Sequence, residues 1–303
     1  MAAIRLLQAE ITGKCQARCV HCFNDSGPKG SNGTMTADDW RRVFRQAADV
    51  GTEVIQIVGG EPMLHPALPD LIAHALNLGV RVEVYSNLVY VPSRVWDLLT
   101  HPRMSVATSW YSADPAEHNR ITGRPTHARI KANILALVAR SVPLRVGVID
   151  IDPRQNASQA LEELRRLGVT DCGIDRVRHL GRATTTTSPD TSQLCGHCGQ
   201  GIVTVLPSGD VVPCPMGRWL VAGSVHSNSL ADLIDPVTAL ARHEIPAATG
   251  VTCRPPCEPQ CHPGQDQCAP EKDGCVPTKN CNPAQPCKPR NPCRPDVTCR
   301  PTP

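Results

Sequence analysis

The sequence predicts an α/β fold whose strands form a largely parallel sheet. Strand-like and helix-like segments alternate six times between residues 4 and 182, which is the arrangement of repeated βα units. Apolar stripes at helical spacing stop at glycines such as Gly51 and Gly168, where helices commonly end. Two polar motifs directly follow strand-like segments, at the ends where parallel sheets carry active groups. A complete eightfold barrel does not fit before the composition changes near Thr184.

Six segments are predicted to be the strands of this sheet. β-branched and other apolar residues dominate each of them, as in buried or half-buried strands. The segments are residues 4–11, 53–58, 80–85, 105–110, 144–151 and 172–178.

Five helices are predicted between these strands. The first is the clearest, because Thr36 and Asp39 can form a capping pair and an apolar stripe runs from Trp40 to Val50. The other four are marked by apolar stripes over residues 68–76, 93–99, 126–138 and 161–167. We interpret all five stripes as core and assign them no chemistry.

Three cysteines follow the first strand in the pattern C-x3-C-x2-C. They are Cys15, Cys19 and Cys22, and the next cysteine along the chain is Cys172. A cubane iron–sulfur cluster normally takes four thiolates, so three of them leave one iron open for a ligand. A structural zinc site is the alternative, although such sites usually pair their cysteines at short spacing.

The second motif, Gly59-Gly60-Glu61-Pro62, comes directly after the second strand. A pair of glycines allows a positive φ and lets the backbone approach a ligand closely. The neighbouring carboxylate can accept hydrogen bonds from an ammonium group. An ordinary strand-to-helix turn is the alternative interpretation.

In this order and at these strand ends, the two motifs resemble those of the radical S-adenosylmethionine (radical SAM) superfamily. The resemblance implies a partial (β/α)6 barrel and a 4Fe-4S cluster held by the three cysteines. The open iron of such a cluster chelates the amino and carboxylate groups of SAM. By the same resemblance, the expected SAM-binding residues are Gly59, Gly60, Glu61, Pro62, Asn87, Ser109 and His21, the last lying against the adenine. Residues 118–123 also resemble the loop that follows the fourth strand in this family.

A second cysteine-bearing region follows a Thr-, Ser- and Pro-rich linker over residues 184–190. A β-hairpin with its turn at residues 208–210 is expected to bring Cys214 towards Cys195 and Cys198. Together with Gly209, this resembles the start of a SPASM or twitch extension, which implies one or two auxiliary 4Fe-4S clusters. A zinc knuckle is the alternative for these thiols.

Beyond Cys214 the cysteine spacing departs from the SPASM pattern. Cys253 and Cys257 are candidate further ligands, but their spacing leaves the number of auxiliary clusters open. From Cys275 to Cys299 a cysteine recurs every six residues, each with a proline two positions later. Such proline density favours extended chain without a packed core. We therefore expect a radical SAM core over residues 1–183, an extension over 184–252 and a partly disordered segment over 253–303.

Composition excludes several classes of protein. The net charge is +3, Lys and Arg do not cluster and aromatic residues are 3%, so a nucleic-acid partner is not expected. No apolar run approaches the roughly 20 residues of a membrane helix, and no secretory signal opens the chain. The sixteen cysteines are then better read as metal ligands than as disulfides, which predicts a cytoplasmic protein.

The resemblance implies an enzyme that cleaves SAM reductively and abstracts a substrate hydrogen. A ribosomally made peptide is the expected substrate, with an external electron donor such as flavodoxin or ferredoxin. Since the first strand starts almost at the first residue, leader binding would fall to a separate protein. The rivals are a dehydrogenase acting on a small molecule and a non-catalytic zinc or iron–sulfur protein. No catalytic acid or base is predicted.

Overall fold

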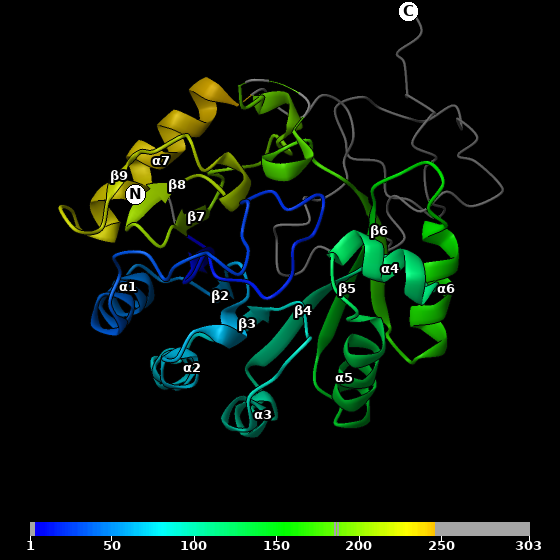
Figure 1. The fold of residues 1–303 in the computed structure, drawn as a ribbon. Coiled ribbons are helices and arrows are strands. Elements are labelled where there is room, and N and C mark those ends of the chain that lie inside the picture. The colour runs from blue at the N-terminus through cyan, green and yellow to red at the C-terminus, as the bar shows by residue number, and fades with distance from the viewer. Residues whose placement is uncertain (1–3, 185, 187, 246–303) are drawn as a thin grey trace, which may run out of the picture.

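The computed structural model describes residues 4–184, 186 and 188–245, and the predicted α/β fold is confirmed there. The described strands form one sheet in the order β6-β5-β4-β3-β2-β1-β7-β8-β9 (Figure 1). From β1 to β6 all neighbours are parallel, and the helices between them form an outer layer. This is the expected partial barrel. The strands are Leu6–Glu10 (β1), Val54–Val58 (β2), Arg81–Tyr85 (β3), Met104–Trp110 (β4), Leu144–Asp150 (β5) and Asp171–Arg176 (β6).

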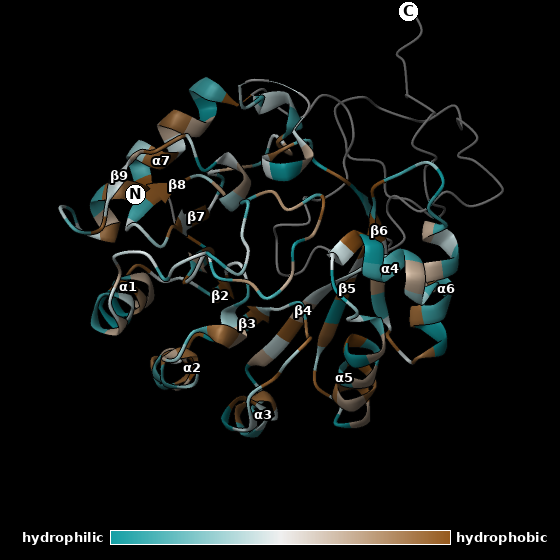
Figure 2. Cartoon of the chain, viewed as in Figure 1, coloured by the Kyte–Doolittle hydropathy of each residue, from teal (hydrophilic) through white to brown (hydrophobic). Residues whose placement is uncertain are grey.

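The predicted helices are present, and their apolar stripes face the sheet. They are Ala37–Asp49 (α1), Leu68–Asn77 (α2), Ser93–Leu99 (α3), His127–Ala139 (α5) and Ala157–Arg166 (α6). Thr36 and Asp39 form the expected capping box of α1, and Trp40 and Phe44 of this helix are fully buried. Figure 2 shows that the outer helices carry both hydrophilic and hydrophobic residues, as helices packed on one face should.

One helix, Pro115–Thr122 (α4), was not predicted, because we assigned its residues to a loop. Asp114 caps it by accepting a hydrogen bond from the backbone of Ala116 at 2.9 Å, and Gly123 ends it with a φ of 68°. These capping signals are visible in the sequence, but the segment has too short an apolar stripe to be recognised. The C-terminal carbonyls of α4 hold the cysteine loop, as described below.

The extension continues the sheet instead of forming a separate layer. Ile202–Val205 (β7) pairs in parallel with β1, and Asp210–Val212 (β8) returns antiparallel to it, which confirms the predicted hairpin. Gly223–Ser224 (β9) and the helix Leu230–Glu244 (α7) follow. The short 3-10 segments are Pro62–Leu64 (η1), Gly181–Ala183 (η2), Thr191–Gln193 (η3) and Pro215–Gly217 (η4). Backbone pairing therefore ties the extension to the first barrel strand.

The candidate ligands Cys253 and Cys257 and the repeat from Cys275 to Cys299 lie outside the described residues. Among the helices of the described ranges, none is long and apolar enough to cross a membrane.

Candidate active site

The carboxyl ends of the strands surround a cavity of about 280 Å³. Both groups of predicted cysteine ligands line it: Cys15, Cys19 and Cys22 from the loop after β1, and Cys195, Cys198 and Cys214 from the extension. His21, Gly59, Gly60, Asn87 and Ser109 line the same cavity. The structure thus brings the two cysteine groups and most of the expected SAM-binding residues to one opening.

The cysteine loop, residues 11–36, is held by hydrogen bonds from several sides. The backbone N–H of Cys15 donates to Gly27 at 3.1 Å, and the N–H groups of Arg18 and Val20 donate to the last carbonyls of α4. The Arg182 guanidinium, which follows β6, donates to the carbonyl oxygens of Cys19 at 2.8 Å and Ser26 at 2.7 Å. Because these contacts fix the backbone, the three thiols have a defined arrangement.

Arg182 also forms an ion pair with Asp25 at 2.8 Å. The sequence analysis did not single out this arginine, which follows the sixth predicted strand. No sequence pattern identifies it as a support for the cysteine loop, because its partners lie more than 150 residues earlier.

The thiols of Cys15 and Cys19 are protonated unless a metal binds them. Burial, with Glu61 and the Cys22 thiol nearby, raises the pKa of Cys15 to about 11. Burial, with the two other thiols nearby, raises the pKa of Cys19 to about 12. Metal binding therefore has to displace these protons. In the described ranges no three His, Cys, Asp or Glu side chains converge as a single bound ion requires. A cubane instead takes its thiolates at separate irons.

The loop also presents a buried nitrogen with no hydrogen-bond partner among the described residues, Nδ1 of His21. Its ring lies edge-on to Tyr111, with ring centroids 4.9 Å apart. Burial and the nearby Arg182 lower the pKa of His21 to about 4, so its imidazole is neutral at physiological pH. A neutral ring with a free polar atom at the cavity suits a bound nucleoside, and the residues present fit a cluster with SAM beside it.

A positive φ, one of the two expected reasons for the glycine pair, is not found, and close backbone packing gives another reason. Gly59 and Gly60 do not have positive φ values. A Cβ on Gly60 would lie 2.5 Å from the carbonyl oxygen of Lys14, and one on Gly59 would lie 2.7 Å from that of Thr12. Backbone hydrogen bonds of 2.6 and 2.7 Å join the two segments. The motif is therefore packed backbone to backbone against the cysteine loop.

Glu61 lies beneath the cavity and does not line it, and neither does Pro62. The fully buried carboxylate of Glu61 accepts hydrogen bonds from the backbone N–H groups of Met63 at 2.9 Å and Asn87 at 2.7 Å. It also accepts one from Ser86 Oγ at 2.8 Å. Pro62 begins η1, which Glu61 caps. In this structure Glu61 joins the turn after β2 to the turn after β3.

Burial makes Glu61 a source of pH-dependent stability. Burial raises the pKa of Glu61 from 4.5 to about 7, although the three hydrogen bonds that the carboxylate accepts oppose the change. The folded state therefore holds this proton more tightly than the unfolded state does. The free energy of unfolding should fall by roughly 3 kcal/mol as the pH rises through about 4.5 to 7. We expect Glu61→Gln to remove this part of the pH dependence in denaturant unfolding of the metal-free protein.

Glu53→Gln is the matched control for this prediction, because the Glu53 side chain is 56% exposed. Its unfolding should keep the pH profile of the parent. A Glu61→Gln variant with the parent's slope between pH 4.5 and 7 would contradict the assignment.

Asn87 and Ser109 both line the cavity and make further contacts. The Asn87 side-chain amide donates to Cys15 Sγ at 3.5 Å, and its backbone N–H donates to Glu61. The Ser109 hydroxyl lies 2.9 Å from that of Tyr85. Asn87 therefore joins the Cys15 thiol to the buried carboxylate of Glu61.

Several cavity residues were missed by sequence reasoning. Tyr85, Tyr111, Arg145 and Arg178 all line the cavity from strand ends or strand interiors. Arg145 is buried with its partner Glu83 at 2.9 Å. Charged residues inside otherwise apolar strands were the available signal, since such groups are rarely buried unless paired.

The second cysteine group forms around the hairpin as expected. Cys198 Sγ lies 3.2 Å from Cys214 Sγ and 3.8 Å from Cys195 Sγ. The backbone N–H of Gly217 donates to Cys214 Sγ at 3.2 Å. Three thiols thus gather at the cavity wall that the extension supplies.

Comparison with known families and sequences agrees with this geometry. The family model of the radical SAM superfamily matches residues 9–170, more than half of the chain. A PqqA peptide cyclase of Streptomyces rochei is 31% identical over 141 residues, 46% of this chain and 39% of that protein. The chain thus aligns with well under half of that relative. A PqqA peptide cyclase of Xanthomonas axonopodis pv. citri is 28% identical, over 77% of this chain and 74% of that protein.

Solved structures share the fold. Streptococcus suis SuiB bound to its precursor peptide SuiA superimposes with a TM-score of 0.66 at 15% identity, over 79% of this chain and 66% of that one. The structure of anSMEcpe with bound AdoMet gives a TM-score of 0.62 at 12% identity, over 79% of this chain and 82% of that one.

Proposed function

Because the chain belongs to the radical SAM superfamily, we propose that Cys15, Cys19 and Cys22 bind its catalytic 4Fe-4S cluster and that the cavity beside them binds SAM. When bound and reduced, a cluster at these cysteines would supply the one electron needed to split the C5′–S bond of SAM, giving methionine and a 5′-deoxyadenosyl group able to take a hydrogen atom from the substrate. The observation that carries this proposal is the shared cavity of the cysteines, the glycine motif and the polar strand ends.

The chain's own residues orient the two cofactors. Asn87 donates to Cys15 Sγ, while Gly59 and Gly60 present backbone at the cavity for the SAM amino group. Glu61 supports this turn from below through Asn87. Ser109 and His21 face the same space and suit the polar and adenine parts of SAM. The apolar side chains of the barrel exclude water from the reaction.

A peptide is the proposed substrate. The matched relatives are named PqqA peptide cyclase, and SuiB was solved with a precursor peptide. We further propose that residues 184–252 form an auxiliary iron–sulfur domain beside a core over residues 1–183. The cavity lined by both cysteine groups supports this, because a substrate held there lies between two metal sites. We also propose two partner proteins, an external electron donor and a separate leader-binding protein.

Metal analysis tests the auxiliary site. The Sγ atoms of Cys195 and Cys198 are 3.8 Å apart. Two thiolate ligands around one tetrahedral zinc, with Zn–S bonds of roughly 2.3 Å, lie at about the same separation. After anaerobic reconstitution we expect iron and sulfide beyond the content of one cluster, and no zinc. The Cys198→Ser variant should lose only this excess. Stoichiometric zinc in the reconstituted parent would contradict the auxiliary cluster.

The function is tested by reconstituting the full chain without air and adding reductant and SAM. We expect 5′-deoxyadenosine and methionine in equal amounts, measured by liquid chromatography. A short peptide encoded beside the gene should then lose hydrogen atoms, as seen by mass spectrometry. Turnover of a small alcohol with no change in the peptide would overturn the peptide proposal alone, whereas no 5′-deoxyadenosine would overturn the enzyme.

A further inference from the structure

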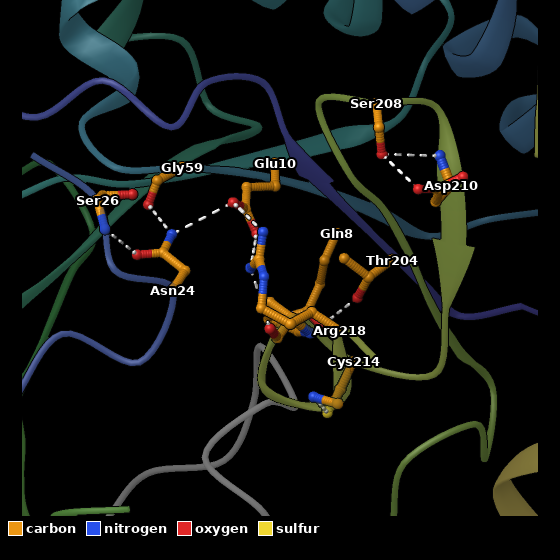
Figure 3. Close-up of polar contacts among 12 residues, drawn as sticks. Gln8, Glu10, Asn24, Ser26, Gly59, Thr204, Ser208, Asp210, Cys214 and Arg218 are labelled. Atoms are coloured by element: carbon orange, nitrogen blue, oxygen red, sulfur yellow. Dashed lines mark hydrogen bonds and ion pairs between the residues drawn. The ribbon is translucent and has the colours of Figure 1, made fainter. Parts of the chain in front are cut away.

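Figure 3 shows a polar network that joins the extension to the cysteine loop through Glu10, the last residue of β1. The Glu10 side chain is 1% exposed. Its carboxylate accepts two hydrogen bonds from the Arg218 guanidinium, at 2.9 and 3.2 Å. A buried carboxylate is costly unless it is paired, and a two-pronged arginine contact fixes its orientation as well as its charge.

Asn24 of the cysteine loop is the third member of this network. Its amide Nδ2 donates to Glu10 Oε1 and to the Gly59 carbonyl oxygen, both at 3.3 Å. Its Oδ1 accepts from the Cys22 thiol at 3.0 Å and from the backbone of Ser26 at 3.3 Å. One side chain thus contacts a cluster ligand, the glycine motif and the buried carboxylate.

Arg218 belongs to the auxiliary cysteine segment. Cys214 caps η4, and Arg218 is the residue that ends it. The guanidinium therefore reaches Glu10 only while η4 keeps its position beside Cys214. A continuous series of contacts runs from Cys214 through Arg218, Glu10 and Asn24 to Gly59 (Figure 3).

We propose that Arg218 is a positioning residue that couples the auxiliary cysteine site to SAM binding at the catalytic site, acting through Glu10 and Asn24. This inference rests on the proposed function. A structured segment at Cys214 holds the guanidinium against Glu10, which then anchors Asn24 against the Gly59 carbonyl oxygen. Loss of order at the auxiliary site would release Asn24 and loosen the SAM side of the cavity.

Arg218→Gln in the full reconstituted chain tests the proposal. We expect the parent's iron content, about tenfold weaker SAM binding by equilibrium dialysis, and a diminished SAM-induced change in the EPR spectrum of the reduced protein. Arg218→Lys keeps the charge and should recover part of the affinity. Arg94→Gln is the control, because Arg94 forms an exposed ion pair with Asp70 and should behave as the parent. Parent-like SAM binding and EPR response in Arg218→Gln would overturn the proposal.

A double variant separates positioning from folding. Glu10→Gln combined with Arg218→Gln removes both charges, so no unpaired charge is buried, and we expect parent-like thermal unfolding with weakened SAM binding. Parent-like binding in this double variant would overturn the proposal even if Arg218→Gln alone were unstable.

Cys214→Ser should also weaken SAM binding, and adding Arg218→Gln to it should have little further effect. Fully additive losses would show that the two sites are not coupled.

The parent protein, measured alongside, distinguishes a failure of the coupling from a failure of the proposed function. If the parent cleaves SAM while Arg218→Gln matches it in binding and spectrum, the proposed function stands and the coupling fails. If the parent gives no 5′-deoxyadenosine, the proposed function fails.

Discussion

Replacing Cys15, Cys19 or Cys22 by alanine should reduce formation of 5′-deoxyadenosine from SAM below detection. Each of these thiols lines the cavity, and each would ligate a different iron of the cluster. With two ligands remaining, the cluster is not retained, so the electron that cleaves SAM has no donor. The rate is measured by liquid chromatography after anaerobic reconstitution, together with the iron content of each variant.

Cys172→Ala is the matched control for these three variants. Cys172 lies on β6, is buried, and donates through its thiol to the Val169 carbonyl oxygen at 3.6 Å. It does not line the cavity. We expect the Cys172 variant to keep the parent's iron content and activity at a small cost in stability. A cysteine-loop variant as active as Cys172→Ala would refute the ligand assignment.

The second large effect is expected from Gly60→Ala. Its new Cβ would lie 2.5 Å from the Lys14 carbonyl oxygen and 2.8 Å from the carbonyl carbon, closer than a Cβ can approach backbone. Either the turn after β2 or the cysteine loop must therefore move. We expect a loss of about 1–3 kcal/mol in the free energy of unfolding, typical of overpacking. SAM binding, measured by equilibrium dialysis, should weaken by about tenfold or more because the cavity wall shifts.

Gly27→Ala provides the control within the same loop. A Cβ on Gly27 would meet nothing within 4 Å, so the added methyl group requires no backbone movement. This variant should bind SAM as the parent does. Equal losses in the two glycine variants would mean that the loop is sensitive to any substitution and that close packing at Gly60 is not the cause.

Much of the barrel could be predicted because its signals are local. The capping box of Thr36 and Asp39 and the stripe of α1 lie within one helix. The hairpin of β7 and β8 depends on a turn at Gly209, whose φ is 85°. Helix α4 was missed although Asp114 and Gly123 mark its ends. Its buried His118 packs on Trp110, Tyr111 and His127, and no local pattern records these contacts.

The residues of the site also fall into two groups, those marked by local patterns and those placed by long-range contacts. Cysteine spacing and the glycine motif singled out residues that line the cavity, because both are short segments with a distinctive composition. Glu10, Asn24, Arg182 and Arg218 were not singled out. Their roles arise from contacts between segments that are far apart along the chain, such as the pair of Glu10 and Arg218, 208 residues apart.

The sequence alone therefore determined the superfamily and the parallel barrel, and it singled out the three cysteines proposed to bind the catalytic cluster. Only the tertiary structure placed Cys195, Cys198 and Cys214 at the same cavity, by pairing β7 with β1. It also showed that Gly60 is required by a backbone contact with Lys14, where the sequence had suggested a positive φ. The physical reason is that residue spacing encodes local geometry, whereas the distance between two segments is set by how the whole sheet packs.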